Sequence, residues 1–184
     1  MNIAVYLASS DGVSPELREK ARELGEWIAK NGHTLVYGGS DCGLMGVIAR
    51  SCMNANGKVI GVEPQYYIDM GFAFAWNEIT ELIVTQTMAE RRAKMIELSD
   101  AFVAFPGGTG TLEEVAEVMS HVMLPNTPEY IDGPCILYSI NGYWDGLKTV
   151  LNNMLEVGFT TKEKQKQVYF CETLEEVTGL LQNK

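Results

Sequence analysis

The chain has 184 residues, of which 46% are hydrophobic, so one well-buried core can form while two full domains would be short of material. The formal net charge of −10 argues against a nucleic-acid-binding surface, which needs clustered lysines and arginines. A small anionic ligand remains compatible with this charge, because backbone N–H groups at a helix N-terminus and one or two arginines can hold it.

Neither a leader peptide nor a membrane span is expected. The N-terminus enters an apolar run directly, without a basic segment, and no stretch approaches the roughly 18 uninterrupted apolar residues of a membrane-spanning helix. We therefore expect a cytoplasmic protein with no membrane partner. His33 and His121 are the only histidines, so no dedicated metal site is expected. Reduced, mostly buried thiols are expected at the four cysteines, Cys42, Cys52, Cys135 and Cys171.

Short apolar runs alternate with longer helical patterns, which is typical of βαβ units in a parallel sheet covered on both faces. The first unit comprises strand Ile3–Leu7, helix Pro15–Lys30 and strand Thr34–Tyr37, with Ser14 as a candidate N-cap and Asn31-Gly32 as the stop. The other expected elements follow in chain order: helix Leu44–Asn54, strand Val59–Val62, strand Glu81–Thr85, helix Met88–Leu98, strand Ala101–Phe105, helix Leu112–Met123, strand Cys135–Tyr138, helix Trp144–Glu156, the short apolar run Val168–Cys171 and a terminal helix near Leu174–Leu181. This order predicts an α/β fold: a single domain, residues 1–184, with a doubly wound parallel sheet flanked by helices.

The segment Pro64–Glu78 fits neither a simple strand nor a simple helix. It is rich in aromatic residues, namely Tyr66, Tyr67, Phe72, Phe74 and Trp76. Packing in the core or at a subunit interface explains these side chains, and so does a cavity wall or lid, since long irregular connections often carry function.

Small polar loops follow three of the predicted strands, at residues 8–12, 38–43 and 106–111. In an open doubly wound sheet, ligands bind outside the carboxyl ends of the strands. The third loop runs straight into a helix, so its N–H groups and the helix dipole would converge on one anion, with Thr109 and Thr111 as hydroxyl donors. The sequence favours a phosphate there over a tight turn without a ligand. Neither the second nor the third loop matches a Walker loop or the usual dinucleotide fingerprint.

Two motifs near this loop have both a structural and a functional explanation. Thr111-x-x-Glu114 has the spacing of a capping box, yet Glu114 lies one helical turn from the predicted phosphate site and could act on a ligand. On the preceding helix, Arg91 and Arg92 share the apolar face, so at least one of them is expected to point inward toward a carboxylate or phosphate. A solvated arginine pair is the alternative.

The arginine helix and the loop motif together resemble the LONELY GUY (LOG) family of cytokinin riboside 5′-monophosphate phosphoribohydrolases. The resemblance rests on Met-Ala-Glu-Arg-Arg at residues 88–92 and Pro-Gly-Gly-Thr-Gly-Thr-Leu-Glu-Glu at residues 106–114. Val-Tyr-Gly-Gly at 36–39, Gly-Leu-Met-Gly at 43–46 and Val-Ile-Gly-Val at 59–62 also match, and residues 132–134 and 142–144 match more loosely.

This resemblance implies a homodimeric, Rossmann-like enzyme that hydrolyses the N-glycosidic bond of an adenine-type nucleoside 5′-monophosphate, without an organic cofactor. The family's catalytic arginine and glutamate fall on Arg91 and Glu114. Substrate contacts are expected at ten positions: Ser9, Gly39, Met45, Arg92, Gly107, Gly108, Thr109, Gly110, Thr111 and Ser120. Members of this family are often mislabelled lysine decarboxylases, a chemistry that needs a pyridoxal-phosphate lysine for which the sequence shows no motif. A non-catalytic nucleotide carrier or sensor on the same fold is the main alternative, and a dehydrogenase is the third.

Overall fold

The computed structural model describes residues 1–70 and 78–182, which form one seven-stranded sheet with helices on both faces. The strand order is β4-β3-β2-β1-β5-β6-β7, and every neighbouring pair is parallel. The strands are β1 (Asn2–Tyr6), β2 (Thr34–Tyr37), β3 (Lys58–Pro64), β4 (Glu81–Thr85), β5 (Ala101–Ala104), β6 (Cys135–Tyr138) and β7 (Val168–Cys171). The predicted doubly wound α/β fold is therefore confirmed.

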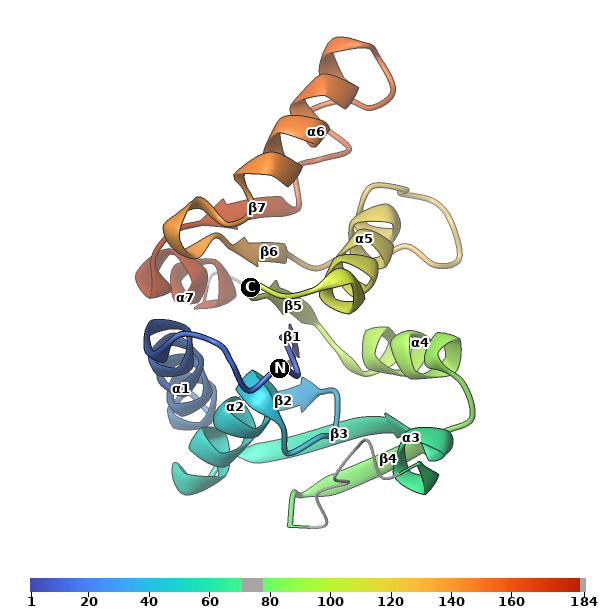
Figure 1. Cartoon of the computed structure of the whole chain (residues 1–184). Coiled ribbons are helices and arrows are strands. Elements are labelled where there is room, and N and C mark those ends of the chain that lie inside the picture. The colour runs from blue at the N-terminus through green and yellow to red at the C-terminus, as the bar shows by residue number, and fades with distance from the viewer. Residues whose placement is uncertain (71–77, 183–184) are drawn as a thin grey trace.

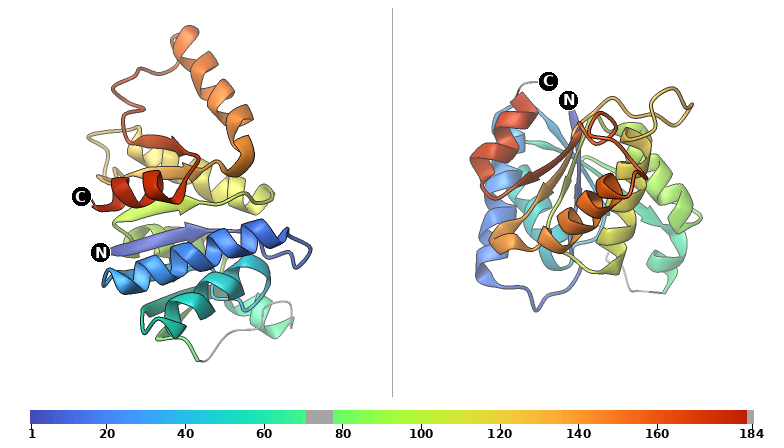
Figure 2. Two further views of the ribbon diagram at one scale, coloured as in Figure 1. Left: turned by 90° about the vertical axis from the view of Figure 1, so that its left-hand side faces the viewer. Right: turned by 90° about the horizontal axis from the view of Figure 1, so that it is seen from above.

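Helices cover the two faces of the sheet in separate groups. Helices α1, α2 and α7 lie on one face, and α4 and α5 lie on the other (Figures 1 and 2). Helix α6 leans outward beyond β7 and forms one end of the molecule, as Figure 1 and the left view of Figure 2 show. The helical elements are α1 (Pro15–Lys30), α2 (Gly43–Asn54), α3 (Gln65–Asp69), α4 (Met88–Leu98), α5 (Thr109–Val122), the short 3-10 helix η1 (Ile140–Gly142), α6 (Asp145–Glu156) and α7 (Leu174–Gln182).

The core is divided by the sheet into two layers, because successive side chains of a strand point to opposite faces. In β1, Ile3 and Val5 belong to the cluster that includes residues of α1, α2 and α7, whereas Ala4 and Tyr6 belong to the cluster that includes residues of α4 and α5. All four are buried. Burial on both faces explains why the strands are continuous apolar runs in the sequence rather than alternating patterns.

The order of the strands creates a crevice at the centre of the sheet. From β1 the chain adds β2, β3 and β4 outward on one side, and α4 then returns it to β5 on the other side of β1. The connections after β1 and β5 consequently leave in opposite directions. Such a topological switch point is where doubly wound folds bind ligands, outside the carboxyl ends of the strands.

Local signals in the sequence set several element boundaries as predicted. The Ser14 hydroxyl caps α1 by accepting a hydrogen bond from the backbone N–H of Leu17 at 3.3 Å, and Asn31 is the C-cap.

All four cysteines are free, and three of them are buried. No helix in the described part of the chain combines the length and the apolar composition needed to cross a membrane.

The segment Pro64–Glu78 differs from its prediction, because it begins with regular structure. Pro64 ends β3, and the next residues form the short helix α3, in which the Tyr66 and Tyr67 rings lie 4.7 Å apart. Pro64 keeps the extended backbone of the strand, with φ −70° and ψ 138°, and is at the same time the N-cap of α3, so the helix follows the strand without a loop. Phe72, Phe74 and Trp76, the other aromatic residues of this segment, lie outside the described residues.

Candidate active site

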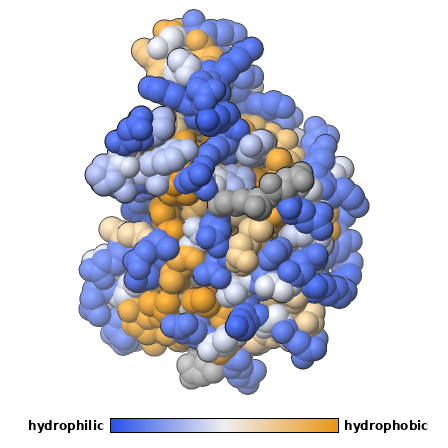
Figure 3. Space-filling model, turned by 180° about the vertical axis from the view of Figure 1, so that it is seen from behind, coloured by the Kyte–Doolittle hydropathy of each residue, from blue (hydrophilic) through white to orange (hydrophobic). Residues whose placement is uncertain are grey.

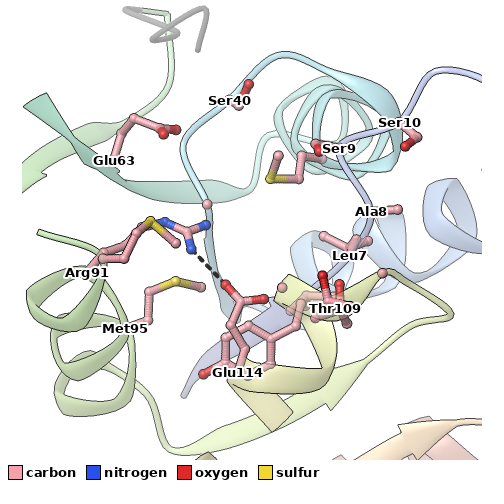
Figure 4. A pocket seen from close by; sticks show the side chains of 18 of the residues that line it. Leu7, Ala8, Ser9, Ser10, Ser40, Glu63, Arg91, Met95, Thr109 and Glu114 are labelled. Carbon is pink, nitrogen blue, oxygen red and sulfur yellow. Dashed lines mark hydrogen bonds and ion pairs between the residues drawn. The ribbon is translucent and has the colours of Figure 1, made fainter. Parts of the chain in front are cut away.

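A cavity of about 450 Å³ lies at the switch point of the sheet. The loops after β1, β2 and β5 contribute to its wall, together with the end of β3 and parts of α3, α4 and α5 (Figure 4). We call it the switch-point cavity. Eight of the predicted site residues line it: Ser9, Met45, Arg91, Gly108, Thr109, Gly110, Thr111 and Glu114.

The first turn of α5 forms one side of the switch-point cavity. The helix begins at Thr109, and its N-cap, Gly108, makes no side-chain capping hydrogen bond. The first N–H groups of a helix have no carbonyl partner within the helix, and the positive end of the helix dipole adds to their attraction for an anion. Because Thr109, Gly110 and Thr111 line the cavity, this turn can bind a phosphate.

Helix α2 also begins after a glycine-containing loop, but its N-terminus is already occupied. The Asp11 carboxylate accepts a hydrogen bond from the N–H of Gly43 at 3.1 Å, and the carbonyl of Ala8 accepts one from the N–H of Leu44 at 3.1 Å. These contacts join the loops after β1 and β2. Of the two glycine loops, the one at residues 106–111 is therefore the better anion site.

Two aromatic residues hold the end of β5 and the loop that follows it. The Tyr143 hydroxyl donates a hydrogen bond to the carbonyl of Gly107 at 2.5 Å, and Trp144 Nε1 donates to the carbonyl of Ala104 at 3.3 Å. Gly107 itself packs so closely on Thr111 that a Cβ there would collide with the Thr111 hydroxyl. Gly107 thus shapes the loop without lining the cavity. The supporting role of the two aromatic residues had no signal beyond the loose family match at 142–144.

Arg91 and Glu114 form an ion pair inside the switch-point cavity. Arg91 Nη1 donates to Glu114 Oε1 at 2.7 Å, and only about a tenth of either side chain is exposed, 10% and 9%. Arg91 Nε also donates to the carbonyl of Val62 at 2.9 Å, which fixes the guanidinium against β3. The predicted inward arginine is therefore Arg91, and the alternative of a solvated pair is wrong for it.

The capping-box explanation of Glu114 is wrong. Helix α5 starts at Thr109 rather than at the predicted Leu112, so Thr111 lies inside the first turn and is buried. Gly108 occupies the N-cap position, for which glycine is an accepted residue. The Glu114 carboxylate consequently faces Arg91 and the cavity rather than the backbone at the start of the helix.

The ionisation of Glu114 reflects two opposing effects. Burial raises the pKa of its carboxyl above the ordinary value, because the charged form loses hydration, while the Arg91 guanidinium limits the rise. A carboxylate whose pKa is raised is a stronger base than a solvent-exposed one.

Four of the predicted substrate-binding residues do not line the switch-point cavity, namely Gly39, Arg92, Gly107 and Ser120. Arg92 bridges α4 and α5 instead, with Nε 2.5 Å from a Glu117 carboxylate oxygen and Nη1 3.0 Å from one of Glu113. Consecutive residues of a helix point about 100° apart, so Arg92 cannot share the inward direction of Arg91. Ser120 is exposed on α5. Neither residue contacts the described cavity.

Gly39 lies beside the cavity rather than in its wall, and with Gly38 it makes room for other side chains. A Cβ on Gly38 would collide with the Arg91 guanidinium and lie 2.7 Å from Met45 Sδ. Gly39 has a φ of +83°, and a Cβ there would lie 3.2 Å from Oε2 of Glu63. These two glycines therefore allow Arg91 and Glu63 to approach the loop after β2.

Glu63 was not among the predicted site residues, yet it lines the switch-point cavity and is only 4% exposed. Burial raises the pKa of its carboxyl to about 7, against the lowering effect of Arg91. The signal in the sequence was a charged residue that ends an apolar strand, between Val62 and Pro64. Glutamate is almost never fully buried without a partner, so this position called for an explanation. Tyr67 also lines the cavity, which agrees with the cavity-wall explanation of the aromatic segment, whereas Tyr6 and Ser40 were not predicted.

Comparisons with known proteins match this chain over most of its length. A family model described as "Possible lysine decarboxylase" matches residues 45–181. A cytokinin riboside 5′-monophosphate phosphoribohydrolase of Rhodococcoides fascians is 35% identical over 176 residues, covering 95% of this chain and 85% of that protein. One from Mycobacterium tuberculosis is 34% identical over 174 residues, covering 95% of this chain and 89% of that protein.

Among solved structures, the molybdenum cofactor carrier protein of Chlamydomonas reinhardtii superimposes with a TM-score of 0.73. The match covers 99% of this chain and 96% of the carrier, at 21% sequence identity. At that identity the likeness concerns the fold alone.

Proposed function

Because the chain belongs to the family of cytokinin riboside 5′-monophosphate phosphoribohydrolases, the LOG family, we propose that it hydrolyses the N-glycosidic bond of an adenine-type nucleoside 5′-monophosphate. A cytokinin riboside 5′-monophosphate or AMP would yield the free base and ribose 5-phosphate. The observation that carries the proposal is the buried Arg91–Glu114 pair, which faces the same cavity as the uncapped first turn of α5.

The first turn of α5 is the proposed phosphate site. Its N–H groups and the hydroxyls of Thr109 and Thr111 supply donors in the wall of the cavity. A phosphate held there would fix the ribose by contacts remote from the reacting bond. Binding energy of this kind can be used to orient the substrate for reaction.

Glu114 is the proposed catalytic carboxylate. Cleavage of an N-glycosidic bond builds positive charge on the sugar, and a carboxylate near the anomeric carbon stabilises that charge or activates the attacking water. Glu114 lies one helical turn beyond the proposed phosphate site on the same helix, which suits the distance between the phosphate and the anomeric carbon of one nucleotide.

Arg91 is the proposed partner of Glu114 in catalysis. Its hydrogen bond orients the carboxylate, and its positive charge favours the ionised form of Glu114, which is the form that acts as a base. The backbone carbonyl of Val62 holds the guanidinium in place.

The cavity fits hydrolysis better than the decarboxylation that the family description names. Pyridoxal-phosphate enzymes hold their cofactor as a Schiff base on a lysine. The described residues of the cavity wall include no lysine. We therefore assign no cofactor to the proposed reaction.

Incubation with a panel of nucleoside monophosphates, including AMP and N6-prenylated AMP, tests the proposal. Chromatography should show free base and ribose 5-phosphate in equal amounts with the wild-type protein and neither with Glu114→Gln. The non-catalytic carrier predicts a different result, namely tight nucleotide binding without release of base over a long incubation. A dehydrogenase would instead require binding of NAD(P).

We further propose that the protein is a cytoplasmic homodimer that acts on a small molecule and binds no nucleic acid. A band of hydrophobic surface runs through the middle and lower part of the face in Figure 3, which a second copy could cover. Sedimentation velocity tests the dimer: a single monomeric species at micromolar concentration would contradict it. The large apolar side chains that are exposed include Met70, Val84, Leu112, Leu124, Val150, Met154, Val157 and Phe159.

A further inference from the structure

We propose that Glu63 is the acid that protonates the departing base, an inference that rests on the proposed function. The role follows from where the Glu63 side chain lies in the switch-point cavity and from its unsatisfied carboxyl oxygen. Glu114 is committed to the sugar side of the reaction, so the leaving base needs a separate proton donor.

The carboxyl group of Glu63 is buried without a full set of partners. Glu63 is only 4% exposed, and its Oε2 finds no hydrogen-bond partner within residues 1–70 and 78–182. An unsatisfied buried oxygen is rare in folded proteins because it loses hydration without compensation. Because Glu63 lines the cavity, its carboxyl group can meet a ligand that enters there.

The order of groups along the cavity matches the order of parts in a nucleotide. Figure 4 shows Arg91 between Glu63 and Glu114, with Thr109 on the other side of Glu114. A nucleotide whose phosphate binds at Thr109 would extend its ribose past Glu114. Its base would then continue past Arg91 toward Glu63. The phosphate, anomeric carbon and base thus each meet a group of suitable chemistry.

The surroundings of Glu63 keep a proton on its carboxyl. Arg91 of α4 faces it and favours the ionised form, but burial outweighs this effect and raises the pKa of Glu63 to about 7. The other titratable groups coupled to it are the phenols of Tyr37 on β2 and Tyr66 on α3, and burial raises the pKa of both above the ordinary value. Neutral phenols add no positive charge, so the acid form is populated near neutral pH.

The proposed step is balanced. The bond between the anomeric carbon and the ring nitrogen breaks, and its electron pair leaves with the base. The proton of Glu63 passes to a ring nitrogen of the base. A water oxygen bonds to the anomeric carbon, and a proton of that water passes to Glu114. The products are the neutral base and ribose 5-phosphate. Exchange with solvent returns a proton to Glu63 and removes one from Glu114.

A substrate whose leaving group needs no proton can distinguish a proton-donating Glu63 from a Glu63 that acts on the reaction in another way. In 4-nitrophenyl ribofuranoside 5-phosphate, the nitrophenolate departs as a stable anion. For Glu63→Gln we expect kcat on the best purine nucleotide of the panel to fall by about 10²- to 10⁴-fold, the usual contribution of general acid catalysis. On the nitrophenyl substrate we expect kcat to change by less than about threefold, since no acid is needed. Glu81→Gln, the same substitution at an exposed position on β4, should leave both rates unchanged.

Measurements on the wild-type protein give a second test that does not depend on folding of a variant. Its kcat for the purine nucleotide should fall as pH rises through 7, whereas kcat for the nitrophenyl substrate should lack that decrease. The role of Glu63 alone would be overturned if Glu63→Gln lost both activities equally or lost neither. It would also be overturned if kcat of the wild type fell above pH 7 in the same way for both substrates. Failure of the wild type to cleave any substrate would overturn the proposed function, and this inference with it.

Discussion

Substitution of Glu63 by glutamine should stabilise the protein, and the gain should depend on pH. The Glu63 carboxyl is buried, and its pKa is about 7 in the folded chain against an ordinary value of 4.5. The folded state therefore holds this proton more tightly than the unfolded state does. Glutamine has nearly the same shape and carries no charge at any pH.

The magnitude follows from proton linkage. Below about pH 4.5, Glu63 is protonated in both the folded and the unfolded state, so it does not make the free energy of unfolding depend on pH. As pH rises from 4.5 to about 7, the unfolded state releases the proton first, so the free energy of unfolding of the wild type falls. At about 1.4 kcal/mol for each pKa unit, the wild type loses about 3 kcal/mol relative to Glu63→Gln. Above pH 7 the difference remains constant.

Urea denaturation of the wild type and Glu63→Gln at pH 5 and pH 8 measures this effect. The comparison of the two proteins cancels other titrating groups, because they are common to both. We expect the advantage of the variant in free energy of unfolding to grow by about 2 to 3 kcal/mol between these pH values. An advantage that is the same at both pH values would refute the assignment of a buried, protonated Glu63.

Three further substitutions test other parts of the site. Arg91→Ala leaves the Glu114 carboxylate buried without a partner, so urea denaturation should show that the free energy of unfolding falls by about 3 to 5 kcal/mol. Release of base should stop as well. A fall of less than about 1 kcal/mol would contradict a buried ion pair. Glu114→Gln should lower kcat by at least about 100-fold with the fold intact by circular dichroism, whereas normal turnover with reduced thermal stability would favour a structural role. Gly110→Ala and Gly179→Ala each place a Cβ in open space within a helix, so each should add up to about 1 kcal/mol of stability. Only Gly110→Ala fills the wall of the cavity, so calorimetry should show weaker ribose 5-phosphate binding for that variant alone; equal binding by both would contradict the phosphate site.

The sequence predicted the frame of the site because its signals are local. Strands buried on both faces appear as apolar runs, and Ser14 and the glycines mark where helices and loops begin. Helix Met88–Leu98 and strand Glu81–Thr85 have the predicted bounds. The loop at residues 106–111 could be found for the same reason, since it combines a strand end with a helix start.

The wrong predictions concern side-chain directions that depend on contacts between distant elements. Spacing within a helix cannot show whether Arg91 or Arg92 faces the sheet, and the choice is made by the Val62 carbonyl and by α5. Likewise, the spacing of Thr111 and Glu114 fits a capping box, but the N-cap of α5 is Gly108, three positions before Thr111. Glu63 was missed because the predicted strand ended at Val62, whereas β3 continues to Pro64 and pairs Glu63 with Val84 of β4.

The most direct test of the account is the fate of AMP and N6-prenylated AMP with the wild-type protein in water enriched in ¹⁸O. Hydrolysis of the N-glycosidic bond predicts one free base for each ribose 5-phosphate and no heavy oxygen in the phosphate group. Tight binding with no release of base, or release of phosphate without the base, would contradict the assignment of Glu114 and Arg91 to this reaction.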